Sequence, residues 1–217
     1  MPTFARLNLE GPLMAVAGSR IDGEPDRLPV PSAGWLAGLI GAAMGWRRGD
    51  DRLRRLRETL LYGIAVRREG TPMEDYQTAM IGQPHMRVGF RADGSAYERK
   101  GGPQTKVGAQ EARRPLVADA AFVAVLTSPE FDADTIAEAV SRPVFPPYLG
   151  RRACVPTAPL DAGTVEAPSL VEAMRSVEDA ERWWLPATIL APPPGVFAVP
   201  VTERRGGASL WASHPCS

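Results

Sequence analysis

The sequence predicts an α+β domain in which two strand–helix–strand halves are separated by a long insertion. Strand patterns occur at 3–9, 62–68 and 118–126, and apolar residues with helical spacing follow the first and the third. The stretch 71–115 is polar, glycine-rich and weakly patterned. Two such halves match the ferredoxin-like plan. The length of 217 residues suits a single domain over 1–217.

The first half opens with the strand at 3–9, where apolar and polar residues alternate. Gly11 and Pro12 are expected to end this strand, and 11–31 is predicted to be a Gly- and Pro-rich loop. Ser32 then offers an N-cap for the first helix. Asp50 and Asp51 offer a cap for the second helix.

The first predicted helix contains an unusual number of glycines. They are Gly34, Gly38, Gly41 and Gly45. Each costs an isolated helix about 1 kcal/mol relative to alanine. We therefore expect a sheet or another backbone to pack very close to this helix.

The insertion, about 71–115, is predicted to contain a protruding β-hairpin. Met86, Val88 and Phe90 alternate with arginines, and Asp93-Gly94 supplies a dipeptide typical of hairpin turns. A plain loop is the alternative, because loops of this length are either functional or lack structure.

The second half begins with the buried strand 118–126. Asp132 or Asp134 is expected to cap a short helix that Pro143 closes. The chain after about residue 161 carries weaker patterns. They predict a proline-dense loop at 142–159, a short helix at 170–177, one or two strands within 189–202 and frayed chain from Gly206.

The formal net charge is zero, but charge is distributed unevenly along the chain. Residues 47–68 carry a net +5, residues 87–114 a net +4 and residues 115–181 a net −7. This asymmetry suits a protein that meets a polyanion on one side and other proteins on the other.

Compartment and metal chemistry follow from what the sequence lacks. No apolar stretch approaches the roughly 18 residues of a membrane span. The N-terminus has no secretory pattern, so we expect a cytoplasmic protein without membrane contact. Cys154 and Cys216 are the two cysteines, and neither a disulfide nor a metal site is expected from them.

The sequence contains no phosphate-binding loop, nucleophile elbow or dinucleotide-binding loop, so we expect the protein to have no enzymatic activity and to bind no cofactor. One alternative is metal-free RNA cleavage by Tyr76 and His85 with Lys106, in which the 2′-hydroxyl is the nucleophile. An ordinary polar loop histidine is the other interpretation of His85.

Binding features are better defined. After two prolines, the chain presents Tyr148, Arg151 and Arg152, an aromatic face and two guanidiniums suited to bases and phosphates. The alternative is that both arginines pair with carboxylates of the acidic segment 115–181. The Ser32–Gly34 turn is a second phosphate candidate, with ordinary helix capping as its alternative.

Several segments occur in an order shared with a known family. They are Leu9-Glu10-Gly11-Pro12-Leu13, Pro31-Ser32, Gly38-Leu39-Ile40-Gly41-Ala42-Ala43-Met44-Gly45, Asp75-Tyr76-Gln77-Thr78, Asp119-Ala120-Ala121-Phe122-Val123 and Pro147-Tyr148-Leu149-Gly150-Arg151-Arg152-Ala153-Cys154. In this order they resemble the CasD family of CRISPR-associated proteins, and the last block resembles its type I-E members, which are Cascade subunits.

The resemblance implies a RAMP-type ferredoxin-like domain for antiviral defence, whose insertion is a thumb. Such a subunit is non-catalytic, caps the 5′ handle of CRISPR RNA (crRNA), contacts the Cascade backbone and large subunits and meets target DNA through the assembled complex. Candidate RNA contacts are Tyr148, Arg151, Arg152, Ser32, Gly34, Arg20, Arg27, Lys106, Arg113 and Arg114. The alternative is a metal-free endoribonuclease that processes precursor crRNA.

Overall fold

The computed structural model describes residues 1–20, 25–80, 88–90, 95–98, 109–186, 198–201 and 209–215. Its helices are α1 (Ala33–Ala43), α2 (Asp51–Thr59), α3 (Ala133–Ser141) and α4 (Leu170–Arg175). Its longer strands are β1 (Thr3–Met14), β4 (Leu61–Arg68), β5 (Thr71–Met80), β8 (Ala109–Thr127), β9 (Asp161–Glu166), β10 (Arg182–Pro186) and β12 (Ser209–Pro215). Short strands are β2 (Ala17–Arg20), β3 (Pro25–Arg27), β6 (Val88–Phe90), β7 (Ala96–Glu98) and β11 (Ala198–Val201).

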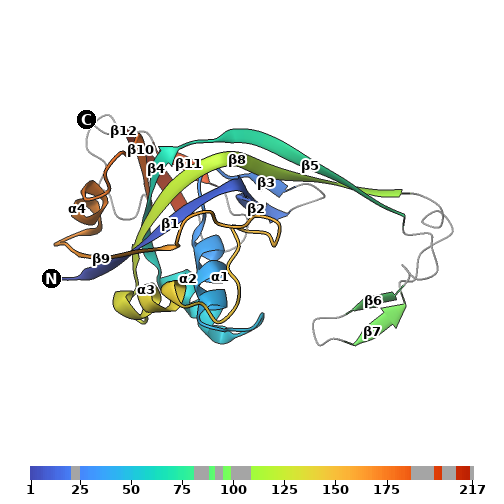
Figure 1. The fold of residues 1–217 in the computed structure, drawn as a ribbon, viewed down its shortest axis with the longest axis horizontal. Coiled ribbons are helices and arrows are strands. Elements are labelled where there is room, and N and C mark those ends of the chain that lie inside the picture. Colours follow the sequence, from blue (N-terminus) through green and yellow to red (C-terminus); the bar gives the residue numbers. More distant parts are fainter. Residues whose placement is uncertain are drawn as a thin grey trace.

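The fold is a mixed α/β structure built on one antiparallel sheet (Figure 1). Its strand order is β11-β12-β10-β4-β8-β1-β9, and β5 also pairs with β8. The long central strands β1 and β8 are paired antiparallel from Ala5 opposite Leu126 to Met14 opposite Val117.

Each face of the sheet buries its own apolar cluster. On one face, Leu7 and Leu9 of β1 join a core that includes Leu36 and Ile40 of α1. On the other face, Phe4 joins a smaller cluster with residues of α4. The alternation along β1 therefore points Ala5, Leu7 and Leu9 into the larger core, whereas Phe4 packs on the opposite face.

The first strand does not end at Gly11 and Pro12, as the sequence led us to expect. β1 runs on to Met14, because Gly11 pairs with Ala120 and the ladder resumes beyond Pro12. Proline has no N–H to donate, and the cross-strand register has no pair at Pro12. The predicted loop 11–31 is likewise corrected, since β2 and β3 form an antiparallel pair within it.

The predicted helix starts are confirmed. Ser32 accepts from the Trp35 N–H, Asp50 from the Arg52 N–H and Asp132 from the Thr135 N–H. Of the two candidate caps for α3, Asp132 is the one used, and α3 ends before Pro143.

The end of α1 is a Schellman-type cap that fixes the path of the chain towards α2. Gly45 has a φ of 76°, its N–H donates to the Ala42 carbonyl, and the Trp46 N–H donates to the Gly41 carbonyl.

No described helix is long and apolar enough to span a membrane.

The insertion begins and ends with a long two-stranded ribbon. β5 and β8 pair from Thr71 opposite Ala118 to Met80 opposite Ala109, and the pair extends away from the rest of the sheet (Figure 1). The predicted strand 118–126 is thus the end of a longer strand. β6 and β7 are paired, whereas Met86 and Asp93-Gly94 lie outside the described residues.

The chain after residue 161 differs most from expectation. The predicted helix at 170–177 is confirmed as the shorter α4, but β9 and β10 were not predicted. The prediction of frayed chain after Gly206 was wrong for 209–215, since β12 pairs with β10. Within 189–202, only 198–201 is described, as the strand β11.

Candidate nucleic-acid interface

The segment 143–155, called the Tyr148 loop below, lies against the C-terminal end of α1. The Val144 N–H donates to the Ala43 carbonyl at 2.8 Å, and the Phe145 N–H donates to the Ala42 carbonyl at 3.3 Å. These bonds satisfy carbonyls that a helix end leaves without intrahelical partners. The entry of the loop is thereby fixed to the helix.

Leu149 anchors the middle of the loop. Its side chain is fully buried, its N–H donates to the Cys154 carbonyl at 2.7 Å, and its carbonyl accepts from the Ala15 N–H at 2.9 Å. Cys154 is buried beside it, and this burial raises the pKa of the Cys154 thiol above its ordinary value, against the opposing charge of Arg151.

Gly150 allows the loop to approach β1 closely. Its φ is 85°, and an added Cβ would lie 2.2 Å from the Ala15 carbonyl oxygen and 2.6 Å from Nε1 of Trp35. That indole nitrogen already donates to the same carbonyl at 2.9 Å. Only glycine combines this backbone conformation with this proximity. The loop is therefore held at three places, which gives Tyr148 and Arg152 a defined position.

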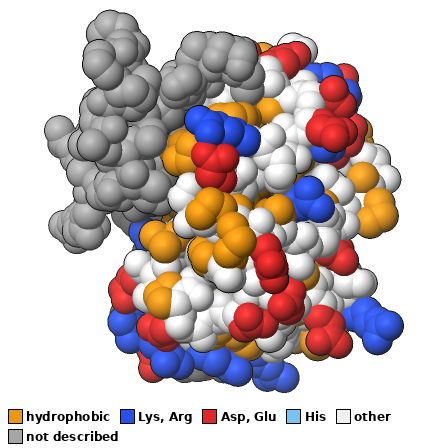
Figure 2. Space-filling view, turned by 90° about the vertical axis from the view of Figure 1, so that its left-hand side faces the viewer, with side chains coloured by type: hydrophobic (Ala, Val, Ile, Leu, Met, Phe, Trp, Pro, Cys, Tyr) orange, Lys and Arg blue, Asp and Glu red, His pale blue; other side chains and the backbone are white. Residues whose placement is uncertain are grey.

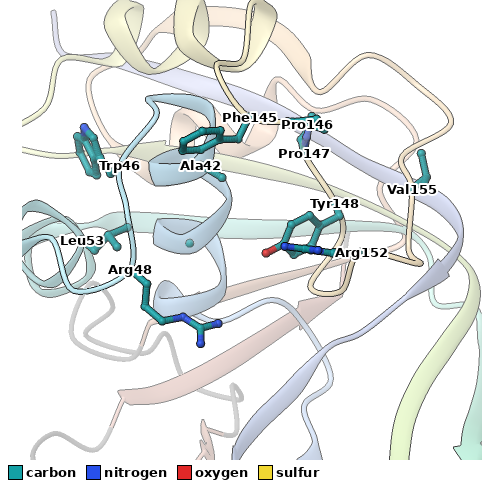
Figure 3. Close-up of a pocket in the computed structure, with 11 residues that line it drawn as sticks. Ala42, Trp46, Arg48, Leu53, Phe145, Pro146, Pro147, Tyr148, Arg152 and Val155 are labelled. Carbon is teal, nitrogen blue, oxygen red and sulfur yellow. The ribbon is translucent and has the colours of Figure 1, made fainter. Parts of the chain in front are cut away.

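A pocket of about 730 Å³ lies between the loop, α1 and the start of α2 (Figure 3). Its lining residues are Gly38, Ala42, Trp46, Arg48, Leu53, Phe145, Pro146, Pro147, Tyr148, Arg152 and Val155. Arg48 and Arg152 are its charged residues, so the described lining contains two cations and no carboxylate. Both are exposed, and neither forms an ion pair with a described residue.

The aromatic residues of the pocket differ in how much surface they offer. Phe145 and Tyr148 are 41% and 38% exposed. Trp46 is nearly buried, with the Arg52 guanidinium 4.9 Å from its ring centroid and Phe131 at 5.3 Å. Phe145 and Tyr148 are therefore the rings available to a ligand.

A smaller pocket of about 200 Å³ continues along the same helix. It shares Gly38, Ala42 and Tyr148 with the first and adds Gly34 and Gly150. The two hollows thus follow one face of α1, on either side of Tyr148.

The glycines of α1 have different neighbours. A Cβ on Gly41 would lie 2.2 Å from Cδ2 of Leu53, so α2 packs there closely, as expected. A Cβ on Gly38 would meet nothing within 4 Å, and Gly38 is exposed. The expected close packing therefore does not hold at Gly38, which instead lines the pocket.

Arg151 points elsewhere. Its guanidinium donates to Asp75 in the middle of β5, at 3.0 Å, and the Gln77 amide donates to the same carboxylate at 2.7 Å. The ion pair weighed as the alternative is thus present for Arg151, although its partner lies on β5 and not in the acidic segment 115–181.

The Ser32–Gly34 turn is an ordinary helix cap in this structure, since Oγ of Ser32 accepts from the Trp35 N–H. A Cβ on Gly34 would lie 3.6 Å from Nε of Arg57. A guanidinium therefore lies beside the turn, and a phosphate role for Ser32 and Gly34 stays a prediction.

Two further candidates lie on the ribbon. Arg113 is exposed, forms an ion pair with Glu74 at 3.3 Å and lies 5.8 Å from the ring centroid of Tyr76. Arg114 is half-buried and is the cross-strand partner of Asp75. These arginines are positioned by the ribbon, and their contact with RNA stays a prediction.

Several candidates have no described side-chain geometry. Arg20 and Arg27 lie in β2 and β3, but their side chains are outside what is described. Lys106 and His85 lie outside the described residues, so the proposed Tyr76–His85–Lys106 group is not tested by the geometry.

The basic segment 47–68 is partly neutralised by neighbouring carboxylates. Arg52 pairs with Asp50, Arg55 with Glu130, and Arg68 with both Glu10 and Asp119. Figure 2 shows acidic and basic side chains mixed on the side that carries α4 and β9, with basic side chains gathered at its lower edge. The net charge of +5 counted over 47–68 therefore overstates how positive the surface of this segment is.

The sequence prediction missed Arg48, Phe145 and Gly38 as members of the site. Arg48 belongs to the segment with a net charge of +5, and Phe145 precedes the two prolines of the loop. Each residue therefore lies in a notable segment, but the sequence does not show that the two are neighbours. Only the fold brings them together.

The antiparallel sheet, with α1 and the Tyr148 loop on one face, is a fold shared with CRISPR-associated proteins of solved structure. The sequence model of the family described as CRISPR-associated protein (Cas5) matches residues 5–205, and the chain belongs to this family. It is 30% identical, over 184 residues, to the "CRISPR system Cascade subunit CasD" of Escherichia coli (strain K12), covering 82% of this chain and 78% of the relative.

Solved structures agree. A chain of a "CRISPR RNA-guided surveillance complex" superposes with a TM-score of 0.63 and 30% identity, covering 97% of this chain and 88% of that one. A second, titled "Crystal structure of Cas protein", has a TM-score of 0.61 and 24% identity, covering 98% and 94%, and shows the shared fold.

Proposed function

We propose that this protein is a non-catalytic subunit of a Cascade surveillance complex that caps the 5′ handle of crRNA. Family membership supports the complex, since the E. coli relative is a Cascade subunit. The observation that carries the RNA role is the pocket beside the Tyr148 loop, where Arg48 and Arg152 face a space with no carboxylate among its described lining residues. Cations without competing anions bind phosphates of a single strand well.

The domain as a whole is proposed to be the ferredoxin-like, RAMP-type domain of this family, covering 1–217. The order β4-β8-β1-β9, with helices between β1 and β4 and between β8 and β9, supports this assignment. The β5–β8 ribbon is proposed as the thumb that reaches between the handle and the neighbouring backbone subunit, and the large subunit docks nearby.

RNA retention tests this proposal. The protein is co-expressed with its neighbouring genes, and the RNA that co-purifies is sequenced and quantified. Arg152→Ala should reduce the retained RNA several-fold, whereas Arg175→Ala on α4, paired with Glu172, should not. If Arg152→Ala and Arg48→Ala together leave RNA retention unchanged, the pocket is not the RNA site.

Catalysis is tested separately. Purified protein is incubated with labelled repeat RNA in EDTA, and the proposal expects intact RNA. Discrete cleavage that disappears in His85→Ala would instead establish the endoribonuclease.

A further inference from the structure

We infer that the 730 Å³ pocket holds one unstacked nucleotide, with its base against Gly38 and Ala42 and its phosphate between Arg48 and Arg152. This inference rests on the proposed RNA-binding function and names the ligand unit of that site. It assigns binding roles to Arg48, Gly38 and Phe145.

The floor of the pocket suits a flat ring. Gly38 is exposed in the middle of α1 and nothing lies within 4 Å of where its Cβ would be, so the surface there is formed by backbone. Ala42 is one helical turn further and adds only a methyl group. A glycine and an alanine together let a planar group come close to the helix.

The walls supply stacking surfaces. Phe145 and Tyr148, which are 41% and 38% exposed, flank the pocket from the loop, and Figure 3 shows the Tyr148 ring on the same side as Arg152. Exposed aromatic rings are typical stacking platforms for single-stranded bases, because stacking removes their apolar surface from water. Because the loop is hydrogen-bonded to α1 and to Ala15, just after β1, these rings are held in place before a ligand arrives.

The charges identify the ligand as an anion. Arg48 comes from the chain that follows α1, and Arg152 comes from the opposite side of the pocket, on the loop (Figure 3). Two guanidiniums, with no carboxylate among the described lining residues, favour a phosphate diester, and the aromatic walls favour a base next to it. A nucleotide satisfies both sets of groups in one ligand.

Filling the floor separates base binding from phosphate binding. Gly38→Leu places a side chain in the pocket without a steric conflict at Cβ, and Arg175→Ala on α4, outside the pocket lining, is the control. The probes are a short labelled single-stranded RNA and the same strand with abasic residues, titrated against the full-length chain. Circular dichroism shows that each variant is folded.

Wild type and Arg175→Ala should bind the base-containing strand more tightly than the abasic one. Gly38→Leu should lose roughly 5- to 150-fold in affinity for the base-containing strand and keep its affinity for the abasic strand, since stacking on one base is worth that much. Arg48→Ala should lower the affinity for both strands.

Three results would overturn the inference. If folded Gly38→Leu binds both strands like wild type, no base occupies the pocket, although the RNA-binding function stands. If it binds RNA normally but no longer co-purifies with a partner subunit, the pocket is a protein-docking site. If wild type binds neither strand, the proposed function fails together with the inference.

Discussion

Arg151 and Asp75 are joined by an ion pair of 3.0 Å between the Tyr148 loop and the first strand of the ribbon. The two side chains are 23% and 32% exposed, and the Asp75 carboxylate also accepts from Gln77. Arg151, which the sequence predicts to contact RNA, therefore fastens the loop to β5. Arg152, which lines the pocket, is therefore the arginine of the loop that we propose as the RNA contact.

The first prediction concerns this pair. A double-mutant cycle with Arg151→Ala and Asp75→Ala should give a coupling free energy of about 1 kcal/mol in chemical denaturation, because both groups are partly shielded from water. The exposed pair Arg175–Glu172 on α4 is the control and should couple more weakly. A coupling free energy near zero in the Arg151–Asp75 cycle would show that this ion pair does not fasten the loop.

The second prediction contrasts two glycines. Gly150→Ala should destabilise the protein by about 2 kcal/mol or more, because the backbone is left-handed there and the Ala15 carbonyl blocks the new methyl group. Gly38→Ala should stabilise it by about 0.5–1 kcal/mol, since the site is helical and open. Thermal unfolding of both variants measures the difference, and a neutral Gly150→Ala would contradict the geometry.

Local signals in the sequence were sufficient for the helix starts. Ser32, Asp50 and Asp132 each act on an N–H two or three residues away, so a short window contains the whole interaction. β9 could not be predicted in this way. Half of its residues are polar and none is buried, and they form a strand because β1 offers an unpaired edge.

The candidate site was predictable in part for the same reason. Tyr148 and Arg152 stand together in one stiff loop, and this local density drew attention to them. Arg48 is distant in sequence and becomes a neighbour only through the Schellman cap at Gly45 and the bonds between the loop and α1. The partner of Arg151 was equally hidden, because the ribbon brings Asp75 to the loop.

The third prediction concerns acid titration of the α2 cap. Hydrogen bonds from the Arg52 side chain and N–H lower the pKa of Asp50 from 3.8 to about 2. A lowered folded-state pKa means that the contribution of Asp50 to stability is present above pH 3.8 and is lost as the pH falls towards 2. The Asp50 carboxyl resonance followed by NMR should therefore titrate near 2. A midpoint at or above 3.8 would show that Arg52 does not hold the carboxylate.

A fourth prediction concerns the thiol beneath the loop. Cys154 is 1% exposed, and burial raises its pKa, so the reactive thiolate is scarce in the folded protein. In a Cys216→Ser background, alkylation of Cys154 should be slow in buffer and fast in denaturant. Fast alkylation under native conditions would mean that the Tyr148 loop opens readily and does not hold its ring and guanidinium in place.

The fifth prediction separates bound phosphates from other contributions to RNA affinity. Each phosphate contact on a single strand contributes about 0.7 to the slope of log affinity against log salt. Arg48→Ala and Arg152→Ala should each reduce the slope by about that amount, and the double variant by about twice as much. Tyr148→Ala should lower affinity without changing the slope, because stacking releases no counterions. Arg175→Ala should change neither. If the slope of the double variant equals that of wild type, the two guanidiniums that line the pocket do not bind phosphate.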